Sequence, residues 1–182
     1  ICWLDDLNDR AEGKTDAIPL GYPDLDRRMA GGARRGELVV IGARPSMGKS
    51  AFVLRVARTV AKLGPVLKLS MEDSTGMLVS RHVAAAGRVN LADVRSPQHA
   101  PASMWEGVSD GVEELQHLHL YINDQPALEL HDVRRKALQV KGRAGDLMLI
   151  IVDYLQLMEG DGESRAQELT RIARGQIGRA HV

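Results

Sequence analysis

The feature that most constrains the fold is a junction at residues 37–63, where three patterns follow one another without a break. Residues 37–42 are mostly apolar and rich in β-branched side chains, which predicts a strand that is buried on both faces. Residues 50–63 place apolar side chains at helical spacing, and Gly64 and Pro65 end that helix. Between the strand and the helix lies a short loop that contains glycine. This order predicts a strand–loop–helix unit of an α/β fold.

The loop carries the residue types that a phosphate-binding site requires. Its sequence is close to the pattern G-x-x-x-x-G-K-[ST], with Ala43 at the first position and Gly42 just before it. Backbone N–H groups of such a loop, together with the N-terminus of the next helix, form a cradle for anions. We predict that Gly48 lets the backbone approach phosphate, that Lys49 contacts the outer phosphates and that Ser50 offers its hydroxyl to Mg²⁺. The predicted nucleotide-binding residues are Ala43, Arg44, Pro45, Ser46, Met47, Gly48, Lys49, Ser50 and Ala51.

Two carboxylates follow predicted strands. Asp153 ends the most apolar run of the chain, residues 147–152, and a carboxylate there is costly unless it is paired or faces a cation. In phosphate-loop enzymes an aspartate at this place helps to hold Mg²⁺. Glu72 follows the strand predicted at 66–71, at the sheet edge where ligands bind, and could take a proton from the water that attacks the γ-phosphate. The adjacent Asp73 competes for that role, and both side chains could instead favour the start of the next helix.

The rest of the chain alternates between helical and strand patterns, which predicts a mostly parallel sheet with helices on both faces. Turn signals fill residues 18–36, and residues 88–104 are rich in loops. The further predicted helices are 74–86, 104–115, 128–141 and 164–174, and the further predicted strands are 118–122 and one within 147–157.

Length and composition agree with one domain in a reducing compartment. The 182 residues suffice for a single core, and only 3% are aromatic, so aliphatic side chains and methionine must fill it. The single cysteine, Cys2, allows no internal disulfide, and neither a signal peptide nor an apolar run long enough for a membrane span is present. We therefore expect a cytoplasmic protein without a membrane partner. The formal net charge of zero neither supports nor excludes binding to nucleic acid.

Several motifs resemble those of the DnaB-type replicative DNA helicase family. Arg-Pro-Ser-Met-Gly-Lys at residues 44–49 is much narrower than the general phosphate-loop pattern, and the other motifs occur in the family's order over residues 18–175. The matching segments are 21–26, 36–38, 43–50, 69–72, 88–89, 121–124, 133–134 and 151–158.

This resemblance implies a RecA-like phosphate-loop ATPase core that hydrolyses ATP with Mg²⁺ to move along single-stranded DNA and unwind duplex, with 5′–3′ polarity. It implies a homo-hexamer, with a primase and a helicase loader as further candidate partners. By position, Lys49 and Glu72 resemble the catalytic lysine and glutamate, and Ser50 and Asp153 resemble the ligands of Mg²⁺.

The resemblance also divides the chain into three parts. Residues 1–17 resemble a linker from an N-terminal domain, and residues 18–175 resemble part of the ATPase domain, which we expect to be incomplete at its C-terminal side. Residues 176–182 depart from the family, and the last six match one reading frame of a common sequencing adaptor, so we expect a non-native tail. The DNA-binding loops and the arginine finger would then be missing, and we expect the fragment alone to be inactive.

Three other functions remain open from the sequence. The first is another RecA-like ATPase, of the recombination or circadian-clock type, which shares the fold but not the Arg-Pro-Ser-Met loop. The second is a small-molecule kinase, which needs an acceptor site and an arginine-rich lid. The third is a fragment that binds nucleotide without turnover.

Overall fold

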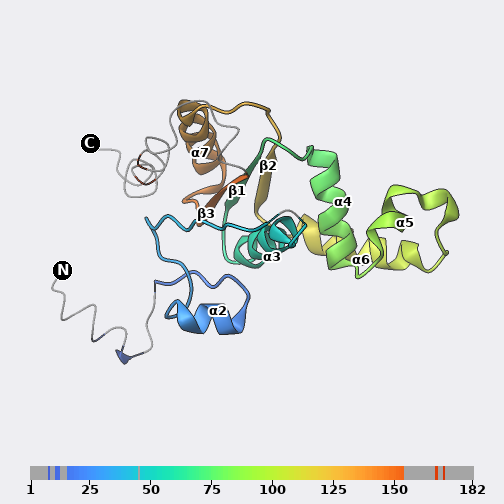
Figure 1. Ribbon diagram of the computed structural model, residues 1–182, viewed down its shortest axis with the longest axis horizontal. Helices are drawn as coiled ribbons and strands as arrows, with labels where there is room; N and C mark the ends of the chain where they lie inside the picture. Colours follow the sequence, from blue (N-terminus) through green and yellow to red (C-terminus); the bar gives the residue numbers. More distant parts are fainter. Residues whose placement is uncertain are drawn as a thin grey trace.

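The computed structural model describes two continuous stretches and five isolated residues, which are 16–44, 46–153, Asn8, Ala11, Glu12, Gln167 and Thr170. Their elements, in chain order (Figure 1), are α2 (Pro23–Arg28), α3 (Lys49–Ala61), β1 (Val66–Ser70), α4 (Thr75–Ala86), α5 (Leu91–Arg95), a short 3₁₀ helix (Pro97–His99), α6 (Met104–Gln116), β2 (Leu120–Asn123), α7 (Leu130–Ala144) and β3 (Leu149–Asp153).

The described strands form a three-stranded sheet in the order β2-β1-β3. Both pairings of the central strand β1 are parallel, so the carboxyl ends of all three strands lie at one edge. The register places Ser70, the last residue of β1, opposite Asp153, the last residue of β3. The predicted parallel sheet is therefore confirmed for the described residues.

Helices cover both faces of this sheet, with α3 on one side and α7 on the other (Figure 1). Because side chains alternate along a strand, β1 contributes to two separate cores. Leu67 and Leu69 pack in one core with α7, and Val66 packs in the other with α3. Every residue of β1 is buried. Burying a Val or Leu side chain contributes about 1.5–3 kcal/mol, so these two layers hold the strand ends in place.

The helices begin where the sequence supplies caps. Ser74 accepts a hydrogen bond from the backbone N–H of Met77 and so caps α4, while Glu129 and Asp132 form a reciprocal capping box at the start of α7. In Figure 1, α4, α5 and α6 extend away from the sheet as a separate arm. This arm carries part of the wall of the site described below.

Close backbone packing holds α4 against α6, and this contact makes a testable prediction. A Cβ on Gly111 of α6 would lie 2.6 Å from the carbonyl oxygen of Val83 and 2.9 Å from the backbone nitrogen of Gly87. We expect Gly111→Ala to lower the free energy of unfolding by about 1–3 kcal/mol, because backbone atoms cannot move aside as side chains do. The matched control is Gly142→Ala in α7, where no described atom lies within 4 Å of the added Cβ.

The control change should stabilise the chain by up to about 1 kcal/mol, since alanine favours a helix over glycine. Chemical denaturation of both variants measures the difference. Equal effects of the two substitutions would contradict the packing described for α4 and α6.

Most predicted elements form with bounds within a few residues of those expected. The predicted helices at 50–63, 74–86, 104–115 and 128–141 correspond to α3, α4, α6 and α7, and the predicted strands at 66–71 and 118–122 correspond to β1 and β2. Strand β3 lies within the apolar run at 147–157. The predicted helix at 164–174 lies outside the described residues except for Gln167 and Thr170, which are helical.

The strand predicted at residues 37–42 is wrong. The segment forms no strand and its large apolar side chains are exposed, with Leu38 at 38% and Val40 at 75%. The physical reason is that apolar composition favours burial, whereas a strand also needs a neighbour for its backbone hydrogen bonds. Both sides of β1 are occupied by β2 and β3, and residues 37–42 pair with neither outer edge in the described part of the sheet.

Residues 18–36 contain more regular structure than turn signals alone predict. Helix α2 begins at Pro23, and proline suits the first turn of a helix because its fixed φ angle is helical and no backbone donor is lost there. Ile18 and Ala33 form an antiparallel bridge that closes this segment. In the stretch expected to be rich in loops, α5 and the 3₁₀ helix form two short helical turns.

Candidate functional site

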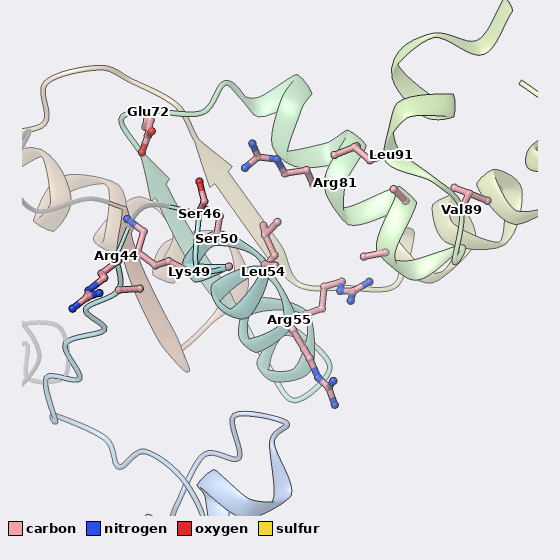
Figure 2. A pocket seen from close by; sticks show the side chains of 16 residues that line it. Arg44, Ser46, Lys49, Ser50, Leu54, Arg55, Glu72, Arg81, Val89 and Leu91 are labelled. Atoms are coloured by element: carbon pink, nitrogen blue, oxygen red, sulfur yellow. The ribbon is translucent and has the colours of Figure 1, made fainter. Parts of the chain in front are cut away.

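An open cleft of about 840 Å³ lies beside the N-terminus of α3, between the predicted phosphate loop and α4 (Figure 2). Its wall includes Glu72, after the end of β1, and Arg81 on α4. The predicted loop residues that line it are Ala43, Arg44, Ser46, Gly48, Lys49, Ser50 and Ala51. Met47 does not line the cleft and is 72% exposed, while Pro45 lies outside the described residues. The structure thus brings Glu72 and most of the predicted loop to one cleft.

The loop turns into α3 through a glycine in the left-handed region. Gly48 has a φ of 84° and is the N-cap of α3, and a Cβ at this position would meet no described atom within 4 Å. The backbone angle, rather than crowding, therefore favours glycine here. Its carbonyl oxygen accepts a hydrogen bond of 2.9 Å from the backbone N–H of Phe52. The first turn of α3, which begins at Lys49, therefore faces the cleft with the positive end of the helix.

Asp153 pairs with two lysines. The ammonium of Lys49 lies 3.1 Å from Oδ1 of Asp153, and the ammonium of Lys68 lies 3.1 Å from Oδ2. Burial raises the pKa of Asp153, but the nearby Lys68 and Lys49 outweigh this effect and hold the pKa below its usual value. The carboxylate is consequently ionised at neutral pH. The structure therefore joins the predicted phosphate-loop lysine to the predicted metal aspartate, although they are distant in the sequence.

The two competing carboxylates after β1 differ in their partners. Asp73 pairs with Arg81 at 2.6 Å, and its backbone N–H donates to Oγ of Ser70. The Glu72 side chain is exposed at the cleft and forms no ion pair or hydrogen bond with the described residues. In Figure 2 it lies above the loop, on the same side as Ser46 and Lys49. This arrangement favours Glu72 over Asp73 as the group that could meet a water molecule.

The residues present have the chemistry that Mg²⁺ requires. Mg²⁺ prefers oxygen ligands and commonly uses one or two protein groups together with phosphate oxygens and water. Ser50 and Asp153 supply a hydroxyl and a carboxylate near the same loop, which fits this pattern. No group of three or more His, Cys, Asp or Glu side chains that could hold a metal ion occurs among the described residues, so a site made of protein ligands alone is not found there.

His82 is a buried histidine near this site that the sequence did not single out. Its side chain is 1% exposed, and neither ring nitrogen has a hydrogen-bond partner in the described part of the chain. Burial lowers the pKa of His82 from 6.5 to about 4, and the positive charges of Arg58 and Lys68 lower it further in the same direction. The ring is therefore neutral at physiological pH.

This depressed pKa predicts a loss of stability in acid. The unfolded chain binds more protons than the folded chain between pH 6.5 and about 4, so the contribution of His82 is complete above pH 6.5 and is lost as the pH falls towards about 4. The loss should reach up to about 3 kcal/mol. Unfolding curves over this pH window should show a smaller loss for His82→Leu than for the unsubstituted chain. Equal losses would place the titration at another group.

Lys68 is the residue at the site that sequence analysis missed. It lies in the middle of β1, on the same sheet face as Asp153, and its side chain is 1% exposed. The available signal was a lysine inside the otherwise apolar run Val66–Ser70, because a charged side chain in a buried strand needs a counter-ion. The sequence alone does not identify that counter-ion.

Comparison with known families assigns the chain to a class. Residues 17–178 match the family of the DnaB-like helicase C terminal domain, which covers most of the chain. The chain belongs to this family. It is 36% identical over 168 residues to the replicative DNA helicase DnaB of Geobacillus stearothermophilus, a match over 90% of this chain and 36% of that protein. It is 37% identical over 180 residues to the DnaB of a Nostoc species, over 96% of this chain and 20% of that protein.

Solved structures agree with this assignment. A helicase-family ATPase domain superimposes with a TM-score of 0.83 at 25% identity, over 93% of this chain and 65% of that domain. A structure of a DnaB-like replicative helicase and its interactions with primase gives a TM-score of 0.84 at 24% identity, over 94% of this chain and 44% of that one. The predicted RecA-like fold is thus confirmed. The chain spans about a third or less of the length of the two curated relatives.

The described helices were also compared with the requirements for crossing a bilayer. None of them is both long enough and apolar enough to span a membrane.

Proposed function

We propose that the chain is the ATP-hydrolysing part of a replicative DNA helicase, which uses the energy of hydrolysis to move along single-stranded DNA and unwind duplex. The observation that carries this proposal is the convergence of Lys49, Asp153 and Glu72 at the phosphate loop. Lys49 contacts Asp153 at 3.1 Å, and Glu72 lies in the wall of the cleft that the loop lines. Membership of the DnaB-like family supports the same conclusion.

Each group has a role that follows from its chemistry. The backbone N–H groups of the loop and the N-terminus of α3 bind the phosphates, and Lys49 exchanges its contact with Asp153 for the outer phosphates. Ser50 and Asp153 would hold Mg²⁺, which when bound neutralises charge that develops on the transferred phosphoryl group. Glu72 orients the attacking water and accepts its proton.

The partners of this function are single-stranded DNA and further copies of the chain. A homo-hexameric ring follows from the family assignment, and the primase named with the similar solved structure supports a primase as a further partner. A helicase loader, 5′–3′ polarity, cytoplasmic location and inactivity of the isolated chain stay predictions, as does the division at residues 17 and 175.

The test of the proposed function is Mg²⁺-dependent phosphate release by the purified chain, measured with and without single-stranded DNA, beside equilibrium binding of a fluorescent ATP analogue. Phosphate release that rises with single-stranded DNA supports the helicase motor. Absence of nucleotide binding would contradict the proposal. Binding without release would support the second candidate, a nucleotide-binding fragment without turnover, which the cleft alone also permits.

A further inference from the structure

Lys68 is a charged side chain in the most buried strand of the sheet. It pairs in register with Ile122 of β2 and Ile151 of β3, and its side chain is 1% exposed. A buried ammonium is costly unless it has a close counter-ion. The sheet therefore fixes a positive charge beneath the cleft, at a position that cannot exchange with solvent.

The counter-ion of Lys68 is shared with the phosphate loop. Each oxygen of the Asp153 carboxylate contacts one ammonium at 3.1 Å, Oδ1 that of Lys49 and Oδ2 that of Lys68. The two lysines differ in freedom, since the Lys49 side chain is 28% exposed at the start of α3 and the Lys68 side chain is enclosed. The three groups together carry one net positive charge. Lys49 can leave for a ligand, whereas Lys68 stays with Asp153.

This arrangement matters most when a nucleotide arrives. Once Lys49 moves to the phosphates, the negative charge of Asp153 lies beside them and opposes binding, unless another cation compensates for it. A divalent ion between the carboxylate and the phosphates provides one compensation. Lys68 provides a second that is always present. The effect of Lys68 on the pKa values of both Asp153 and His82 agrees with a positive potential in this region.

We infer that Lys68 is a positioning residue that stands behind Asp153 as a built-in cation, so that the cleft binds nucleotide even without a divalent metal ion. This inference rests on the proposed nucleotide-binding function. It concerns the dependence of nucleotide affinity on metal, and not the chemical step. Without Lys68, the nucleotide affinity would depend much more strongly on the metal ion.

The experiment measures the dissociation constant of fluorescent ADP in excess EDTA and in excess Mg²⁺, for the full 182-residue chain. In Lys68→Met the ratio of the EDTA value to the Mg²⁺ value should rise by about tenfold or more, because a charge is removed within a few ångströms of the phosphates. Lys68→Arg keeps the charge and should keep the ratio of the unsubstituted chain. The matched control is Lys62→Met, which removes a lysine that pairs with Glu114 away from the cleft and should not change the ratio.

A structural defect would weaken both dissociation constants together and leave their ratio unchanged, and an unchanged ratio in Lys68→Met overturns the inference. The unsubstituted chain provides a test that needs no variant, because its EDTA and Mg²⁺ values should differ by less than about tenfold if Lys68 compensates Asp153. A difference of about a hundredfold or more would overturn the inference but leave the proposed function intact. Absence of ADP binding under both conditions would overturn the proposed function and this inference with it.

Discussion

Lys49→Ala should weaken ATP binding by roughly 10- to 100-fold, because hydrogen bonds to a charged group contribute about 1.5–3 kcal/mol each. The lysine begins α3 and lines the cleft, where its ammonium now contacts Asp153. In the nucleotide complex the same ammonium is expected to contact the outer phosphates. Equilibrium titration with a fluorescent ATP analogue in excess Mg²⁺ measures the change.

Lys62→Ala is the control for the loss of one positive charge from the same region of the chain. Lys62 follows α3 directly and pairs with Glu114 of α6 at 3.0 Å, so it does not belong to the cleft. Its removal should leave nucleotide affinity unchanged. If Lys49→Ala bound ATP as tightly as Lys62→Ala, the phosphate-binding role of the loop would be refuted.

Glu72→Gln should bind ATP normally but hydrolyse it about 10²- to 10⁴-fold more slowly, which is the usual contribution of a general base. The substitution keeps the size of the side chain and removes its ability to accept a proton. Because Glu72 has no partner among the described residues, its change breaks no contact there that stabilises the fold. Phosphate release at saturating ATP, beside a binding titration, separates the two effects.

Asp73→Asn provides the comparison for the adjacent carboxylate. Asp73 pairs with Arg81 of α4, so this change should lower stability rather than remove the catalytic step. A Glu72→Gln variant with normal turnover, together with a slow Asp73→Asn variant that still binds ATP, would move the role of general base to Asp73.

Sequence patterns predicted the parts of the site that depend on local structure. The glycine before Lys49 and the amphipathic repeat after it predict the loop and the start of α3, since both depend on neighbouring residues. Strand ends at Glu72 and Asp153 follow from apolar runs that the sheet buries. For these features the order of residues along the chain contains most of the required information.

The remaining features depend on contacts between distant segments. Lys68 and Asp153 are 85 residues apart in the sequence, and only the pairing of β1 with β3 brings them together. The same dependence explains the wrong prediction at residues 37–42, where the apolar pattern is strong but no strand pairs with the segment in the described sheet. Pattern gives the tendency of a segment, and its partners decide whether that tendency is realised.

The exposed approach to the loop has a thermodynamic consequence. Because residues 37–42 form no ladder with the described strands, the phosphate loop is fastened to the sheet through α3 on one side only. Fixing the backbone of one residue costs about 1–2 kcal/mol of conformational entropy, so any ordering that a ligand imposes on this approach is subtracted from its affinity. Thermodynamic reciprocity then requires that whatever docks Leu38 and Val40 against another surface tightens nucleotide binding by the same factor by which nucleotide favours that docking.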